Sequence, residues 1–164
     1  MSYREKRFSD LLVSDVSDKL VLKASSVKRD AKIRDVIEQM IANPLSRKVY
    51  VVDEGGRYIG TVNTETILRL LGYRVGVRKD GGISFVRFLR DAFKEEAASV
   101  MAKGLTVAPN TKLTAALDIM LDEHLNDLPV VDEEGKLLGE LVSLELFMEG
   151  RALFPEDQPD VDRT

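Results

Sequence analysis

Val130–Gly139 reads VVDEEGKLLG, and Val51–Gly60 reads VVDEGGRYIG, so one pattern occurs twice at an offset of 79 positions. In each copy an acidic turn containing glycine separates two aliphatic runs, which is typical of antiparallel strands joined by a tight loop. We interpret the acidic residues of both turns as solvated loop residues rather than as metal ligands. The duplicated hairpin predicts that the chain is built from an internal repeat.

Two amphipathic helices are predicted upstream of the hairpins. Apolar residues recur there at positions i, i+3, i+4, i+7 and i+8, which places one apolar stripe along a helix. The matching sets lie 80 positions apart: Ile33, Val36, Ile37, Met40 and Ile41, and then Leu113, Ala116, Leu117, Met120 and Leu121. Closing helices are expected near Asn63–Thr64 and Ser143, whose side-chain oxygens can cap backbone donors. The expected fold class is α+β, with two pseudo-symmetric β-α-β-β-α repeats of the α/β type.

One such repeat buries too little surface to be stable alone, so the two copies are expected to pack as one intramolecular pair around a pseudo-twofold axis. This packing creates two related clefts between the copies, and ligand sites favour such concave junctions. The expected divisions are an N-terminal extension (1–15), the first repeat (16–71), a basic loop and linker helix (72–95), the second repeat (96–152) and an acidic, disordered tail (153–164).

The composition of the 164 residues narrows the function. With 44% hydrophobic and 32% charged residues, the chain resembles a soluble globular protein. No apolar run is long enough to span a bilayer, and the start Met1–Arg7 lacks the apolar stretch of a signal peptide, so we expect a cytoplasmic protein without membrane insertion. The absence of Cys and the single His124 exclude thiol chemistry and multi-histidine metal sites. With neither a Walker loop nor a convincing acid–base pair, we expect a non-enzyme.

The repeated pattern, extended to Leu128-Pro129 before the second hairpin and to Leu105–Leu113 leading into the second helix, resembles a tandem pair of CBS domains, the cystathionine β-synthase type repeat. The resemblance covers nearly the whole chain. It implies a regulatory, energy-sensing module without a required cofactor that binds AMP, ADP, ATP or S-adenosylmethionine in its clefts. It also implies a homodimer that signals to an effector protein.

The resemblance assigns phosphate and ribose contacts to the residues that follow the last glycine of each hairpin. In the first repeat these residues are Asn63 and Thr66, with Thr64 adjacent. Thr66 stands where the family has an Asp, so the bidentate acceptor for a ribose diol is missing. In the second repeat Glu145 keeps the acid, and Ser143 is the candidate phosphate contact because Val142 is apolar. The alternative is that these residues only cap helices beside an empty cleft.

The resemblance also assigns adenine contacts to the strands that open each repeat and follow its first helix. These residues are Ser26, Val27, Val49 and Tyr50 in the first copy, and Thr106, Val107, Ala108, Leu128 and Pro129 in the second. Arg47 and Lys48 could neutralise a phosphate, whereas their equivalents Asn126 and Asp127 cannot. One cleft is therefore expected to favour anions more than the other.

Two alternatives to an adenosine sensor remain open. The clefts could be degenerate and ligand-free, with the chain serving as a protein–protein interaction or scaffold module through the Phe85–Phe93 helix or the basic Arg69–Lys79 segment. Nucleic acid could bind that basic segment, but the net charge of −4, the pI near 5.2 and the acidic second half of the chain make this partner unlikely.

Overall fold

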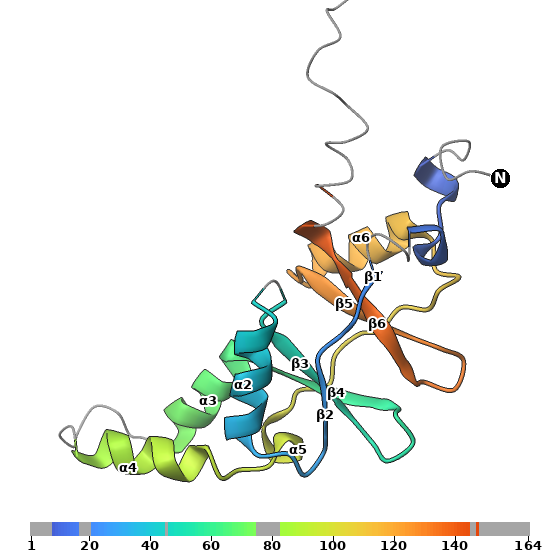
Figure 1. The fold of residues 1–164 in the computed structure, drawn as a ribbon. Helices are drawn as coiled ribbons and strands as arrows, with labels where there is room; N and C mark the ends of the chain where they lie inside the picture. The colour runs from blue at the N-terminus through green and yellow to red at the C-terminus, as the bar shows by residue number, and fades with distance from the viewer. Residues whose placement is uncertain (1–7, 17–20, 45, 75–82, 145–146, 148–164) are drawn as a thin grey trace, which may run out of the picture.

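The computed structural model describes residues 8–16, 21–44, 46–74, 83–144 and 147 (Figure 1). In chain order the elements are η2 (Phe8–Asp10), η3 (Val13–Val16), β1 (Val21–Leu22), β2 (Ser26–Lys28), α2 (Ile33–Ala42), β3 (Lys48–Val52), β4 (Tyr58–Asn63), α3 (Thr64–Arg74), α4 (Ile83–Ala92), α5 (Ala97–Val100), α6 (Leu113–Asp122), β5 (Asp127–Val131) and β6 (Leu137–Val142). The predicted disordered tail lies outside the described residues. No helix in the described ranges is long and apolar enough to cross a membrane.

Within these ranges the strands form two three-stranded sheets, ordered β2-β3-β4 and β1-β6-β5. In the first sheet, β2 runs parallel to β3 and β3 is antiparallel to β4. In the second sheet, β5 and β6 form the equivalent antiparallel pair, and a parallel bridge from Val107 to Val130 repeats the β2–β3 contact. The predicted pair of β-α-β-β-α repeats is confirmed.

The predicted apolar stripes account for the position of α2 and α6, the helices that precede the two hairpins. Ile33, Val36 and Met40 of α2 are buried, and so are their counterparts in α6. Each helix therefore packs its stripe onto the sheet of its own repeat, while the outermost stripe residues Ile41 and Leu121 remain exposed.

The hairpin loops are closed by the acids that open them. The Asp53 carboxylate accepts hydrogen bonds from the backbone N–H groups of Gly55 (2.8 Å) and Arg57 (2.9 Å), and these bonds hold the pKa of Asp53 below its usual value. Asp132 makes the same bonds in the second hairpin. Gly56 and its counterpart Gly135 have φ values of 82° and 79°, which side-chain-bearing residues rarely adopt.

The two hairpin tips meet on the pseudo-twofold axis. The Tyr58 N–H donates to the Gly135 carbonyl (2.9 Å), and the Leu137 N–H donates to the Gly56 carbonyl (3.1 Å). The Arg57 side chain adds a hydrogen bond from Nε to the Glu134 carbonyl (3.0 Å). The two backbone hydrogen bonds are related by the pseudo-twofold axis, because Tyr58 is equivalent to Leu137 and Gly56 is equivalent to Gly135. They therefore hold the two repeats together at one end of this axis.

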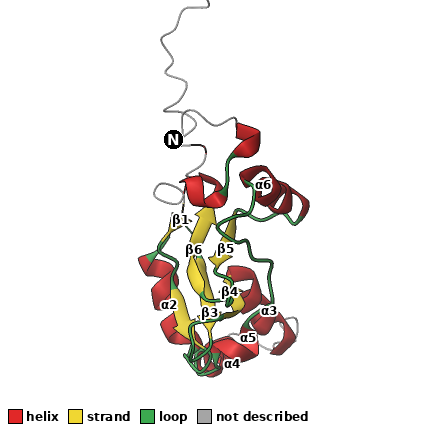
Figure 2. Cartoon of the chain, turned by 90° about the vertical axis from the view of Figure 1, so that its right-hand side faces the viewer, coloured by secondary structure: helices red, strands yellow, loops and turns green. Residues whose placement is uncertain are grey.

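The repeats exchange short segments, as Figures 1 and 2 show for the N-terminal segment beside α6. Leu11, Val13 and Val16 belong to the hydrophobic core of the second repeat, and β1 is hydrogen-bonded to β6. Conversely, α5 packs into the core of the first repeat, and Ala102 and Thr61 exchange two backbone hydrogen bonds of 2.9 Å. Each core is therefore completed by the segment that precedes the other repeat in the chain.

The helix predicted after the basic loop is present as α4, next to α3 (Figure 1). Its Ala92 is buried, while Val86 and the following Phe93 are exposed. Residues 75–82 of the basic loop and the side chain of Phe85 are outside the description.

Candidate ligand site

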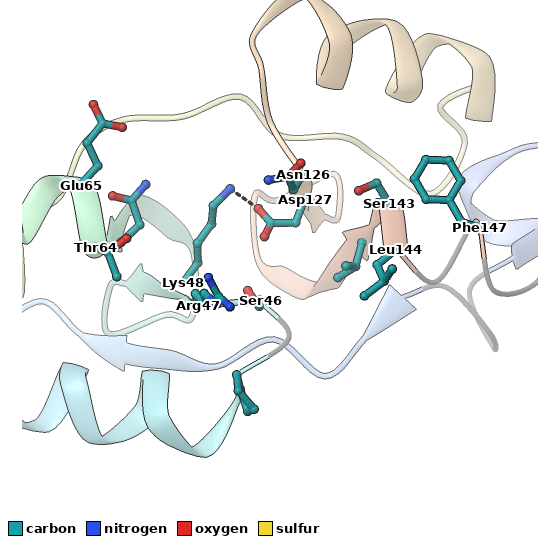
Figure 3. Close-up of a pocket in the computed structure, with 13 residues that line it drawn as sticks. Ser46, Arg47, Lys48, Thr64, Glu65, Asn126, Asp127, Ser143, Leu144 and Phe147 are labelled. Carbon is teal, nitrogen blue, oxygen red and sulfur yellow. Dashed lines mark hydrogen bonds and ion pairs between the residues drawn. The ribbon is translucent and has the colours of Figure 1, made fainter.

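A cleft of about 660 Å³ lies between the repeats and is lined by both of them (Figure 3). Its walls consist mainly of residues in equivalent positions, which places the cleft on the pseudo-twofold axis at the end opposite the hairpin tips. The equivalent pairs are Arg47 and Asn126, Lys48 and Asp127, Asn63 and Val142, Thr64 and Ser143, and Glu65 and Leu144. We call this space the central cleft, and its volume lies within the range that small-molecule sites occupy.

An ion pair between Lys48 and Asp127 crosses the central cleft (Figure 3). Only 3% of the Asp127 side chain and 16% of the Lys48 side chain are exposed. Burial raises the pKa of Asp127, and the neighbouring Lys48 ammonium opposes this rise. Lys48, which was predicted to neutralise a phosphate, is therefore already engaged by a carboxylate.

Arg47 supplies a second positive charge to the cleft. It is exposed, has an unusual φ of 55° and donates its backbone N–H to the Asn43 carbonyl (3.3 Å). Its guanidinium forms no ion pair with any residue that the structure describes. Arg47 is thus the better placed of the two predicted cations to meet an anion.

Helix α3 begins at the central cleft, and its N-terminus is capped by two reciprocal hydrogen bonds. The Asn63 Oδ1 accepts from the Thr66 backbone N–H (2.9 Å), and the Thr66 Oγ1 accepts from the Asn63 backbone N–H (3.0 Å). Thr66 also donates its hydroxyl to the Asn63 carbonyl (2.9 Å), so its side chain is committed to the cap. Asn63 and Thr64 line the cleft, at the helix end where the partial charge is positive.

The equivalent point of the second repeat is less polar. Val142 is buried, and Ser143 donates its backbone N–H to the Asn126 carbonyl (2.9 Å). Ser143 and Leu144 are helical and line the central cleft, in agreement with the predicted helix start. Glu145, the predicted ribose contact, lies outside the described residues.

A smaller space of about 150 Å³, the side cavity, adjoins the central cleft and shares Lys48, Asn63 and Asp127 with it. Its other lining residues are Tyr50, Tyr58, Thr61, Ala102, Lys103, Gly104, Leu105, Leu125, Leu128 and Pro129. The Tyr50 and Tyr58 rings are arranged edge to face with centroids 6.0 Å apart, and the Tyr58 hydroxyl is 2.8 Å from the Thr61 hydroxyl. The Lys48–Asp127 ion pair thus stands where the two spaces meet.

The predicted adenine contacts do not all converge on one space. Tyr50, Leu128 and Pro129 reach the side cavity, but the segment 102–105 forms its wall in place of Thr106, Val107 and Ala108. Thr106 is exposed, Val107 belongs to the core of the second repeat, and Ala108 binds the Thr111 hydroxyl through its backbone N–H (3.0 Å).

In the first copy the predicted adenine contacts are also separated. Val49 is fully buried in the core of the first repeat, and Val27 packs against that core. Ser26 lines a third space of about 280 Å³, the outer cavity, together with Lys23, Ala24, Val52, Gly56, Leu137, Leu138 and Gly139. Apart from Thr106 and Ala108, the predicted adenine contacts are therefore divided between the side cavity, the outer cavity and the two cores.

Glu140 is a buried acid that the sequence interpretation missed. Its Oε2 accepts hydrogen bonds from the hydroxyls of Ser46 and Tyr50, both at 2.8 Å, whereas Oε1 has no hydrogen-bond partner among the residues that the structure describes. Burial raises the pKa of Glu140 against the opposing effect of these two bonds. The pKa of Tyr50 is raised as well, first by burial and then by the nearby Glu140 charge. The sequence signal that could have identified Glu140 is the presence of one acidic residue in the otherwise apolar strand β6.

Comparison with known proteins identifies relatives of this arrangement. The family model described as CBS domain matches residues 11–73 and 97–147, more than half of the chain. A CBS domain-containing protein from Thermotoga maritima is 26% identical, with a TM-score of 0.65 over 85% of this chain and 94% of that protein. A CBS domain protein from Pyrobaculum aerophilum, complexed with AMP, is 19% identical and shares the fold with a TM-score of 0.65 over 87% and 95% of the two chains.

A third relative is an enzyme, but the match is short. Inosine-5'-monophosphate dehydrogenase from Aquifex aeolicus is 39% identical over 64 residues, which is 39% of this chain and 12% of the dehydrogenase. The match therefore spans a small part of that enzyme.

Proposed function

Because the chain belongs to the CBS domain family, we propose that it is a regulatory module that binds an adenosine-containing ligand between its repeats and signals to a partner protein. The candidate ligands are AMP, ADP, ATP and S-adenosylmethionine. The observation that carries the proposal is the union of the central cleft with the side cavity at Lys48, Asn63 and Asp127. The AMP complex of the Pyrobaculum relative supports this choice of ligand.

The two spaces suit different parts of a nucleotide. The side cavity has aromatic and aliphatic walls from Tyr58, Leu128 and Pro129, and its small volume suits the base alone. The central cleft then receives the phosphate, with the start of α3 at Thr64 and the Arg47 guanidinium as its donors. Since Lys48 is paired and Glu65 adds a negative charge to the cleft, we expect AMP to bind more tightly than ATP.

The position of this site supports regulation in preference to catalysis. A ligand in the central cleft touches both repeats at once, so its affinity depends on how they are packed. Occupancy then shifts the balance between packings, which a partner protein can detect.

We further propose that the module acts as a homodimer through its helical faces. Large apolar side chains are exposed at equivalent positions of the two repeats: Ile41 and Leu121, and Leu68 and Phe147, each between 63% and 72% exposed. Two of these residues, Ile41 and Leu68, also line an apolar groove of about 530 Å³ between α2 and α3. The other lining residues of the groove are Ile37, Met40, Pro44, Arg47, Thr64 and Ile67. Recurrent exposed apolar patches of this kind mark association surfaces.

Calorimetric titration of the four ligands tests the proposal, with protein stripped of carried-over ligand by unfolding and refolding. We expect saturable AMP binding that Arg47→Ala weakens on the order of tenfold or more, since a hydrogen bond to a charged group contributes about 1.5–3 kcal/mol. Arg34→Ala, which removes an exposed arginine on α2, is the matched control and should bind like the wild type. If none of the four ligands binds to the folded protein, the scaffold alternative replaces the sensor.

A further inference from the structure

We propose that the module holds one adenosine ligand per chain, because Glu140 fills the pseudo-symmetric counterpart of the side cavity. This inference rests on the proposed function, since it concerns the number of sites and the residue that closes one of them. A duplicated fold predicts two related clefts, but the two differ in the described structure.

Glu140 and Thr61 occupy the same place in their repeats. Thr61 is paired with Tyr50 across the first hairpin, and Glu140 is paired with Pro129 across the second. Thr61 also bridges to Ala102, and Glu140 pairs with Leu22 of β1. The backbone surroundings are therefore equivalent, and only the side chains differ.

The groups that Glu140 contacts show where its carboxylate lies. Ser46 and Tyr50 donate to it, and both lie 79 positions before residues that line the open side cavity, Leu125 and Pro129. On the open side, the short Thr61 leaves this inner space free. On the other side, the longer Glu140 places its carboxylate between the equivalent walls.

The outer part of the space that corresponds to the side cavity in the other repeat remains open as the outer cavity. Its Lys23, Ala24 and Leu137 correspond to Lys103, Gly104 and Tyr58 of the side cavity. Among the described residues, the side cavity shares Lys48, Asn63 and Asp127 with the central cleft, but the outer cavity shares none with it. The continuous path from base site to phosphate site is thus interrupted on the Glu140 side.

Binding on that side would require two unfavourable changes. The ligand would have to displace the carboxylate and break its hydrogen bonds with Ser46 and Tyr50. It would also place its phosphate in the part of the central cleft that Asp127 and Val142 line, where Val142 lacks the polar side chain of its counterpart Asn63.

The stoichiometry of AMP binding, measured by calorimetry per chain, tests this inference. We expect the wild type to bind one AMP per chain, and Glu140→Gln as well, because glutamine has nearly the same shape as the glutamate side chain that it replaces. Glu140→Thr, which copies the open side, should bind two. The reciprocal variant Thr61→Glu should lose the single site, because it places an equivalent carboxylate in the open cavity.

The outcomes separate the two proposals. If the folded wild type binds none of the adenosine ligands, the proposed function fails and this inference fails with it. If the wild type binds two AMP per chain, the inference fails but the proposed function stands. The inference also fails if Glu140→Thr folds and still binds one AMP per chain. Should Glu140→Thr not fold, Thr61→Glu decides, because full AMP binding by that variant places the ligand outside the side cavity.

Discussion

Lys48 and Asp127 stand at the same position of the two repeats and form an ion pair across the pseudo-twofold axis. Identical repeats would bring two like charges together at this point, and their repulsion in a largely buried site would oppose packing. The divergence of one repeat to lysine and the other to aspartate turns that repulsion into attraction. The same divergence makes the central cleft chemically asymmetric.

Removal of Lys48 should destabilise the fold through the acid that it leaves behind. Lys48→Met leaves a buried carboxylate without its cation, which we expect to lower the free energy of unfolding by about 3 kcal/mol at neutral pH. Asp127 then keeps a proton in the folded state at a pH where the unfolded chain has lost it. The deficit should therefore shrink as the pH falls towards the ordinary aspartate pKa of 3.8. Urea denaturation at several pH values measures both effects.

Lys32→Met is the control for this variant. Lys32 forms an exposed ion pair with Glu96, and exposed pairs contribute at most about 1 kcal/mol. Equal losses for the two variants would contradict a special role for the buried pair.

Glu140 should make the protein less stable as the pH rises. Its raised pKa means that above pH 4.5, the ordinary glutamate value, the folded state retains a proton that the unfolded state releases. The free energy of unfolding therefore declines until the pH exceeds the raised pKa. Glu140→Gln does not titrate, so its profile should be flatter than that of the wild type in denaturant unfolding from about pH 4.5 to 7.5.

Tyr50→Phe provides the opposite change, because it removes a hydrogen bond that favours the ionised carboxylate. Its stability should decline more steeply with pH than that of the wild type. Parallel profiles for all three proteins would show that Glu140 does not control this dependence.

Gly60 should not tolerate a side chain. A Cβ at this position would lie 2.6 Å from the Met101 Sδ and 2.8 Å from its Cγ, where β4 meets the segment exchanged from the second repeat. We expect Gly60→Ala to lower the free energy of unfolding by about 1–3 kcal/mol, as overpacking does. Thermal or urea denaturation checks this value.

Gly72→Ala is the matched substitution in open space. Gly72 lies in α3, and no atom of the described part of the chain comes within 4 Å of a new Cβ there, so alanine should raise stability by up to about 1 kcal/mol. A loss at Gly72 similar to that at Gly60 would argue against the close contact as the cause.

A lysine placed in the apolar helical face should prevent dimerisation. Ile41→Lys and Leu121→Lys each put a charge where large apolar side chains are exposed, and the double variant should be monomeric by light scattering at concentrations where the wild type is dimeric. Gln39→Lys, an exposed polar position on α2, should remain dimeric. A wild type that is monomeric at all concentrations would refute the proposed dimer.

Features that depend on neighbouring residues were predictable from the sequence. The hairpins follow from the glycine-containing acidic turns, the burial of α2 and α6 follows from their apolar period, and Asn63 is the expected cap of α3. Each of these depends on contacts within a few positions of the chain, where side-chain chemistry and spacing determine the local geometry.

Features that depend on contact between the repeats were missed. The pairing of Lys48 with Asp127 and the bonds from Ser46 and Tyr50 to Glu140 join residues that are far apart in the chain. The repeat pattern showed that residues 48 and 127 are equivalent, but only the position of the axis brings them into contact. For the same reason the prediction assigned adenine contacts to the segment from Thr106 to Ala108, whereas the side cavity is lined by residues 102–105.

The exchange of short segments between the repeats constrains the order in which the chain matures on the ribosome. Leu11, Val13 and Val16 emerge early, but the core that receives them consists of residues from Val107 to Leu141, which are synthesised much later. The first repeat likewise lacks Ala97 and Val100 until translation has passed beyond its own hairpin. We therefore expect neither repeat to complete its fold as an isolated nascent unit, and both to become native together late in synthesis.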